Sequence, residues 1–242
     1  MTLDGRRLLG SADTRRGLWL TFLSPFGLEV AERAAPIDWI GVDLQHGDID
    51  LTDLSSLVRA SRLPVYARAA SQEATALTRI VDTGVHGLIV PGVDSADQAR
   101  VIVDAVRLPP VGRRSSGLAR ATVLGTDAPV VLAMIETRAG LDAVHEIAEV
   151  AGIDGLFVGP YDLSLSLGES SLTSEPMLSA ITTAVEEARR HEKLAAAFAG
   201  DPELAGLLPP LDLLGVDSDA TALRLGLAEL FAASSLDLAR TS

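Results

Sequence analysis

Short apolar segments alternate along the chain with longer segments in which apolar residues recur every three or four positions. The first pattern is typical of strands buried on both faces of a parallel sheet, and the second of helices that bury one face. We predict eight strands, at residues 17–23, 39–44, 65–69, 87–93, 130–135, 155–159, 195–199 and 213–216. A helix is predicted after each strand, at residues 26–35, 51–61, 72–83, 96–106, 139–150, 175–192, 201–208 and 220–233.

Capping residues support these boundaries. Asp53 and Asp201 are candidate N-terminal caps, and Gly84 stands where a glycine commonly ends a helix. Eight strand–helix repeats in 242 residues predict an α/β protein with one closed (β/α)8 TIM barrel, a single domain over residues 1–242. An open doubly wound sheet is the alternative, but no G-x-G-x-x-G motif opens its first turn.

Composition adds the nature of the core and excludes some partners. Apolar residues make up 48% of the chain and aromatic residues 4%, which predicts a core of aliphatic side chains. A net charge of −13 argues against binding to nucleic acid or to anionic membranes. The absence of cysteine excludes disulfides and thiolate chemistry. We find no signal peptide and no membrane span, and expect a cytoplasmic protein.

Polar residues follow several predicted strands at their carboxyl ends, where barrel enzymes build their active sites. The strand-end residues are Asp43, Gln45, His46, Arg68, Glu136, Thr137, Asp162 and Ser164. Glu136 and Asp162 are the candidate metal ligands, because Mg²⁺ and Mn²⁺ prefer carboxylate oxygens. A 2-oxo acid could fill open positions on such an ion. Alternatively, both acids serve as helix caps or first-turn acids.

His46 is a candidate general base, because imidazole titrates near neutral pH, and Asp43 could fix its tautomer. A structural or surface role is the alternative. The remaining histidines are weaker candidates. His145 and His191 fall in helical segments and are expected in solvent, and His86 precedes a strand, at the end of the barrel away from the chemistry.

Two arginines are candidates for anion binding. Arg68 could hold a substrate carboxylate or an oxyanion with its planar fork. It could also form an ion pair with Asp43 or Glu136, and the two roles are compatible. Arg120 lies in a loop flanked by glycine and serine and is either a second anion contact or a surface residue.

Taken together, the segments GLWL, DWIGVDLQHG, VYARAA, DTGVHGLIVPGV, PPVGRRSSGLARAT, MIETRAGLDAV, IDGLFVGPYDLSLSLG and LGVDSDATAL resemble the HpcH/HpaI family of class II pyruvate aldolases. This family belongs to the phosphoenolpyruvate/pyruvate-binding barrels. The resemblance covers nearly the whole chain, and IETR and GPYDLS at their spacing are its most specific parts.

The resemblance implies roles for these residues. Glu136 and Asp162 would bind a divalent ion, Mg²⁺ or Mn²⁺ with Co²⁺ as a third candidate. His46 would be the base, paired with Asp43, and Arg68 would face the pyruvate oxygens. The backbone of Gly159, Pro160 and Tyr161 would contact the pyruvate carboxylate. Members cleave 4-hydroxy-2-oxo acids into pyruvate and an aldehyde, and assemble as homohexamers with sites near subunit contacts.

Several positions depart from the family pattern and change the expected acceptor side of the site. Gln45 and Met134 stand where Glu and Gln are usual, and Tyr161 where Ala is common. Phe198 occupies a lining position that is often aliphatic, and residues 112–117 and 120–130 are shortened. The resemblance therefore implies an aldolase, with two alternatives: a citrate-synthase-like enzyme that condenses oxaloacetate or another 2-oxo acid, or a silent pseudo-aldolase that only binds a 2-oxo acid.

Overall fold

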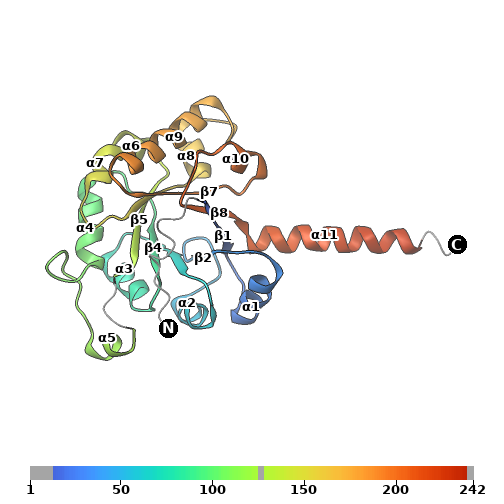
Figure 1. Ribbon diagram of the computed structural model, residues 1–242, viewed down its shortest axis with the longest axis horizontal. Coiled ribbons are helices and arrows are strands. Elements are labelled where there is room, and N and C mark those ends of the chain that lie inside the picture. The colour runs from blue at the N-terminus through green and yellow to red at the C-terminus, as the bar shows by residue number, and fades with distance from the viewer. Residues whose placement is uncertain (1–12, 125–127, 239–242) are drawn as a thin grey trace.

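The eight predicted strands all form, and each pairs in parallel with the next until the last strand closes on the first. The computed structural model describes residues 13–124 and 128–238. Its strands are β1 (Arg15–Leu20), β2 (Trp39–Asp43), β3 (Val65–Arg68), β4 (Gly87–Val90), β5 (Val130–Ile135), β6 (Gly155–Val158), β7 (Leu194–Phe198) and β8 (Leu213–Ser218). Figure 1 shows the helices arranged around this closed barrel. The prediction of an α/β TIM barrel is confirmed.

The helices follow the predicted order with three differences. They are α1 (Pro25–Ala34), α2 (Leu51–Ala60), α3 (Ala74–Val81), α4 (Ala96–Val106), α5 (Leu118–Leu124), α6 (Arg138–Asp142), α7 (Val144–Glu149), α8 (Pro160–Leu167), α9 (Glu175–Arg190), α10 (Pro202–Leu207) and α11 (Asp219–Leu238). The single helix predicted at 139–150 is two helices that meet at Ala143. Helices α5 and α8 were not predicted, because neither has a clear apolar stripe.

The caps confirm two of the three predictions. Asp201 is the N-cap of α10, and Gly84, just after α3, has the positive φ of 89° that favours glycine. Asp53 is not a cap. Asp50 caps α2 by accepting the amides of Thr52 and Asp53, and the Asp53 side chain accepts the Asp50 amide in return. The capping box therefore begins three residues before the predicted cap.

The core has two layers of different composition. Between strands and helices it is aliphatic, as predicted. Inside the barrel the prediction was wrong, because Trp19, Trp39, Tyr66 and Phe157 are packed there together. Glycines make room for three of these rings: a side chain on Gly17, Gly41 or Gly87 would overlap Trp39, Trp19 or Tyr66, respectively. Four aromatic rings therefore fill the interior of the barrel, whereas Phe22, Phe26, Tyr161 and Phe231 are exposed.

The buried carboxylate of Asp219 links the segment after β1 to the start of α11, directly after β8. Asp219, at the start of α11, accepts the amides of Thr21, Phe22 and Leu23 and the hydroxyl of Thr21. These bonds end β1 at Leu20, three residues before the predicted end. Beyond Asp219, α11 projects away from the barrel (Figure 1). None of the described helices combines the length and the apolar character that crossing a membrane requires.

Candidate active site at the mouth of the barrel

The strand ends bring the predicted polar residues to one end of the barrel. Asp43 and Arg68 are the last residues of β2 and β3, and Glu136 directly follows β5. Asp162 lies in the first turn of α8, which follows β6. Since all strands are parallel, these ends meet at the same mouth. The charges of Asp162 and Arg68 both act on the pKa of Glu136, in opposite directions.

Arg68 and Asp43 form a two-bond ion pair at the mouth. Arg68 donates from Nε to Asp43 Oδ1 at 3.0 Å and from Nη2 to Oδ2 at 2.6 Å. The guanidinium carbon lies 5.5 Å from the centre of the Trp19 ring, within range of a cation–π contact. Burial acts to raise the pKa of Asp43, but the Arg68 contacts and two backbone amides outweigh it and hold the pKa below its usual value. The ion pair expected for Arg68 is therefore present.

The sequence had suggested that Asp43 contacts the imidazole of His46. In the structure Asp43 instead contacts the backbone amide of His46. Its Oδ1 atom accepts the amides of Gln45 at 3.0 Å and His46 at 3.2 Å, closing a tight turn after β2. Both carboxylate oxygens also face Arg68, so Asp43 shapes the turn that carries His46. The His46 side chain itself is exposed.

Glu136 is a buried acid with a second acid beside it. Its side chain is 8% exposed. Burial raises the pKa of Glu136, and the negative charge of Asp162 raises it further, while a hydrogen bond from the Gly92 backbone and the charge of Arg68 act in the opposite direction. Two carboxylates in such a position repel each other unless a cation lies between them. Their mutual effect is the feature expected of a metal-binding pair.

Glycine backbones leave space around the Glu136 carboxylate. A Cβ atom on Gly159 would lie 3.1 Å from Glu136 Oε2, and one on Gly92 would lie 3.8 Å from Oε1. A side chain at either position would thus crowd the oxygens that a ligand must reach. Two carboxylates with open space beside one of them suit a hard divalent ion, so Glu136 and Asp162 fit Mg²⁺, Mn²⁺ or Co²⁺.

The first turn of α8 presents amides at the mouth. Gly159 donates its own amide to Ile135, and Pro160 has none. The amides of Tyr161 and Asp162 have no acceptor four residues earlier within the helix, as at any helix start. Ser164 donates its hydroxyl to the Tyr161 carbonyl at 2.7 Å and so stabilises this turn. Of the predicted backbone contacts, Tyr161 is therefore the one that can donate to an anion.

Two further predicted residues occupy different surroundings. Phe198, at the end of β7, is partly buried and stacks against Trp19 with ring centres 5.4 Å apart. Met134, at the position where a polar residue is usual, is 2% exposed and belongs to the inner core. Arg120 falls in α5, but its side chain lies outside the described residues. Phe198 is the last residue of β7 and therefore lies at the level of the strand ends, beside Trp19.

Several contributors to the mouth carry no obvious signal in the sequence. Gln72 donates to the carbonyls of Pro91 and Gly92 at 2.8 and 2.7 Å and so supports the loop that faces Glu136. Asp94 accepts the hydroxyl of Thr137, the residue that caps α6. Gln45 has a side-chain oxygen that is buried without a hydrogen-bond partner in the described part of the protein. Sequence spacing could not find these contacts, because they join residues on different loops.

The three remaining histidines lie away from the mouth. His86, at the start of β4, accepts the Val65 amide on Nδ1 at 3.0 Å, which confirms its structural position. His145 and His191 were expected in solvent; His145 is exposed, at 48%, whereas His191 is 18% exposed. They contact each other and Glu187 on the outside of the barrel.

A family profile described as HpcH/HpaI aldolase/citrate lyase matches residues 15–204. A hydroxypyruvate/pyruvate aldolase of Roseovarius nubinhibens is 34% identical over 206 residues, 79% of each chain. A 2-keto-3-deoxy-L-rhamnonate aldolase of Klebsiella pneumoniae is also 34% identical, over 83% of this chain and 80% of its own. Among solved structures, the citrate synthase SbnG superposes with a TM-score of 0.83 at 26% identity, covering 97% of this chain and 98% of its own.

Proposed function

Because the chain belongs to the HpcH/HpaI aldolase/citrate lyase family, we propose that it is a divalent-metal-dependent aldolase acting on 4-hydroxy-2-oxo acids through a pyruvate enolate. It is accordingly a carbon–carbon lyase. The observation that carries the proposal is the buried Glu136 carboxylate under the influence of both Asp162 and Arg68 at the mouth of the barrel. The aldolase names of relatives at 34% identity support it.

Glu136 and Asp162 would hold the ion, which we propose to be Mg²⁺, Mn²⁺ or Co²⁺. When bound, such an ion supplies Lewis-acid stabilisation for the negative charge of an enolate. Asp162 is exposed, while Glu136 is buried, so the ion would lie at the boundary between the protein and solvent at the mouth of the barrel. A substrate can reach such a position directly from solvent.

Arg68 would orient the 2-oxo acid by donating hydrogen bonds to its oxygens. Its Nε and Nη2 atoms are engaged with Asp43, so its Nη1 atom remains for the substrate. The Tyr161 amide at the start of α8 would bind the substrate carboxylate, aided by the helix dipole. Asp43 and Trp19 fix the guanidinium from two sides, which reduces the reorganisation that substrate binding requires.

His46 would take the proton from the 4-hydroxyl in the cleavage direction. Cleavage of the bond between C3 and C4 then releases the aldehyde and leaves the pyruvate enolate, which is protonated at its methyl carbon. The exposed imidazole stands on the turn held by Asp43 and has room to reach a substrate. Its exposure also leaves it free to exchange the proton with water.

Two other functions remain as alternatives for the same residues: a different reaction of the enolate, and binding of a 2-oxo acid without a reaction. A condensing enzyme would use the enolate of oxaloacetate or another 2-oxo acid, and the structural similarity to a citrate synthase favours this possibility. A silent 2-oxo-acid-binding protein would keep the fold without turnover.

We also propose that the protein works as a homo-oligomer, with a hexamer as the expected form. Apolar side chains of α11 are exposed, including Leu223, Leu225 and Leu230 at 52%, 56% and 67%. Phe26 and Val30 of α1 are exposed as well, at 76% and 52%. A single chain rarely leaves this much apolar surface in contact with water.

Solvent-deuterium exchange into the methyl group of pyruvate tests the proposed function. The protein supplied with Mn²⁺ should catalyse the exchange, because an aldolase forms the enolate without needing the aldehyde. His46→Ala should retain this exchange more than it retains cleavage, which should fall about 10²- to 10⁴-fold. Absence of exchange in wild-type protein with any of the three ions would refute the aldolase. Release of CoA from oxaloacetate and acetyl-CoA would favour the condensing enzyme.

A further inference from the structure

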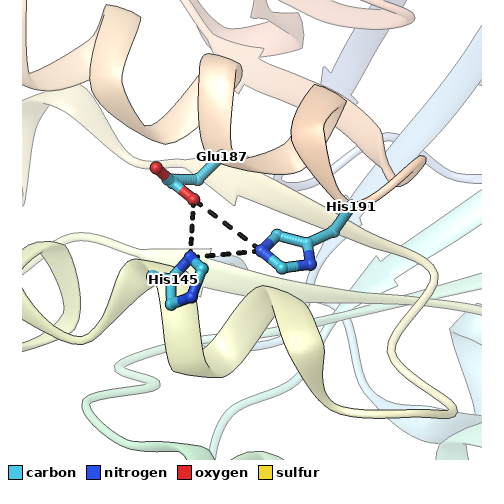
Figure 2. A group of neighbouring side chains, drawn as sticks. All are labelled: His145, Glu187 and His191. Carbon is cyan, nitrogen blue, oxygen red and sulfur yellow. Dashed lines mark hydrogen bonds and ion pairs between the residues drawn. The ribbon is translucent and has the colours of Figure 1, made fainter.

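Three potential metal ligands converge on the outer surface of the barrel, apart from the mouth. His145 lies in α7, Glu187 in the last turn of α9, and His191 directly after α9. Figure 2 shows the two imidazoles and the carboxylate pointing toward a common centre from the two helices. We call these three residues the helix-ring cluster. Its position just before β7 is at the amino-terminal end of the strands, opposite Glu136 and Asp162.

The distances between the three facing atoms are close to those between three ligand atoms in a tetrahedral coordination shell. His145 Nδ1 lies 3.0 Å from Glu187 Oε2 and 3.2 Å from His191 Nε2, and the third edge, from His191 Nε2 to Glu187 Oε2, measures 3.8 Å. Around Zn²⁺ with bonds of about 2.0–2.1 Å, tetrahedral ligand atoms stand about 3.3–3.4 Å apart. The cluster could therefore accept an ion with small side-chain rotations.

Neighbouring residues hold the ligands in the required orientation. Arg190 binds the other oxygen of Glu187, Oε1, at 2.6 Å and leaves Oε2 to face the imidazoles. Glu149 lies 3.6 Å from Nε2 of His145, the ring nitrogen that points away from the centre. A carboxylate on the outer nitrogen of a ligand histidine is the usual second layer of a zinc site, because it favours the tautomer with a free inner nitrogen.

The three side chains are partly exposed to solvent, so water can reach the fourth coordination position of a bound ion. The side chains of Glu187 and His191 are 12% and 18% exposed, whereas His145 is 48% exposed. Two imidazoles and a carboxylate suit Zn²⁺ and related transition ions, in contrast to the all-oxygen pair at the mouth. From this geometry we propose that the helix-ring cluster binds one Zn²⁺ ion that cross-links α7 to α9, with water as its fourth ligand.

Zinc at this place would act on stability and not on the reaction. The ion would join the end of α9 to α7, two neighbouring helices that the contacts of His145 with Glu187 and His191 already link. An ion that binds only the folded chain raises the unfolding temperature, by about 5–10 °C at a free concentration near 100 times its dissociation constant. Activity should change little, because the mouth of the barrel lies at the opposite end.

Cobalt spectroscopy can test the site separately from the catalytic pair. We would use the Glu136→Gln/Asp162→Asn variant, stripped of metal, so that ions at the mouth do not contribute. Added Co²⁺ should give the intense visible absorption of a tetrahedral site, at one ion per chain. Further substitution of His145→Ala or Glu187→Gln should remove it, whereas Glu186→Gln, an exposed acid one residue away, should leave it intact.

A stability measurement separates loss of the ion from loss of folding. Zn²⁺ should raise the unfolding temperature of the wild-type protein and of Glu186→Gln, but not that of the isosteric Glu187→Gln, with circular dichroism to verify that all three are folded. Tetrahedral absorption that survives His145→Ala, or a background variant that binds no Co²⁺ or Zn²⁺ at micromolar concentration, would overturn the proposal. Either result would leave the proposed aldolase unaffected.

Discussion

Asp43 is the residue on which the geometry of the mouth depends most. Its two oxygens accept two hydrogen bonds from Arg68 and two from the backbone of the following turn. One buried carboxylate therefore positions both the candidate oxyanion donor and the segment that carries the candidate base. Removal of any one of these contacts should also disturb the others, because a buried carboxylate with fewer hydrogen-bond donors destabilises the folded protein.

Replacing Arg68→Lys should lower catalytic efficiency although the charge is kept. Lysine cannot make the two parallel bonds to Asp43 and still present a donor to the substrate. We expect kcat/KM for retro-aldol cleavage to fall about 10²- to 10³-fold. Arg100→Lys, in an exposed ion pair with Asp97, is the matched control and should keep full activity. Equal activity of the two variants would show that Arg68 does not contact the substrate.

The stability of the protein should depend on pH through His86. Burial lowers the pKa of His86, and the bond from the Val65 amide requires a free Nδ1 lone pair. The unfolded chain, with a histidine pKa of about 6.5, takes up the proton first as pH falls. This contribution to stability is therefore lost as pH falls from about 6.5 through the lower folded pKa.

The variant His86→Asn can test this assignment, because the asparagine oxygen offers an acceptor that does not titrate. Chemical denaturation at several pH values should give a smaller decrease in unfolding free energy below pH 6.5 for the variant than for the wild type. Parallel curves for the two proteins would contradict the assignment of the dependence to His86.

For single residues, the sequence predicted the position of a chemical group along the chain but not the residues that this group would contact. The strand-end positions of Asp43, Arg68 and Glu136 followed from the apolar runs before them. The bond from the His46 amide to Asp43 did not, because it depends on the conformation of a three-residue turn. The contacts of His145 with Glu187 and His191 join residues more than forty positions apart, and only Glu187 and His191 are related by a local helical spacing.

Among the structural elements, the four strands from β1 to β4 depend on matched pairs of a large ring and a glycine. Tyr66 of β3 lies over Gly87 of β4, its direct partner in the sheet. The pairs Gly17 with Trp39 and Gly41 with Trp19 repeat this arrangement on β1 and β2. Each ring is thereby admitted to a barrel interior that would otherwise be too narrow for it.

Gly87→Ala should therefore destabilise the barrel. The added methyl group would overlap the Tyr66 ring, which is fully buried and cannot move outward. We expect a loss of about 1–3 kcal/mol in unfolding free energy, the usual range for overpacking. Gly206→Ala, in α10, has no atom within 4 Å of the new methyl group and should be neutral or stabilising. Similar stabilities for the two variants would refute the packing account.

The elements themselves were predicted to different degrees for a physical reason. Strands buried on both faces appear as continuous apolar runs, and all eight were found within a few residues of their limits. Helix α8 was not, because its alternating sequence PYDLSLSL has no single apolar face and its start is set by Pro160 and the chain reversal after β6. The break between α6 and α7 falls at Ala143, which is neither a proline nor a glycine, so the sequence did not predict a break there.

For the molecule as a whole, α11 is the element whose surroundings a single chain does not explain. It projects from the barrel (Figure 1), and Leu223, Leu225, Leu227 and Leu230 on it are exposed. The double variant Leu223→Asp/Leu230→Asp should therefore reduce the oligomer to smaller species, measured by light scattering after size exclusion. Glu229→Gln, also on α11, should not change the mass. A wild-type protein that runs as a monomer would contradict the proposed assembly.

The central claim is that Glu136 and Asp162 share one catalytic divalent ion, and a Mn²⁺ titration of retro-aldol activity tests it most directly. Chelator-treated wild-type protein should be inactive and recover with Mn²⁺. Asp162→Asn should need at least about 100-fold more Mn²⁺, more than the loss of an outer-layer contact causes. Full activity of the chelated wild-type protein, or the same Mn²⁺ requirement in Asp162→Asn, would contradict the account.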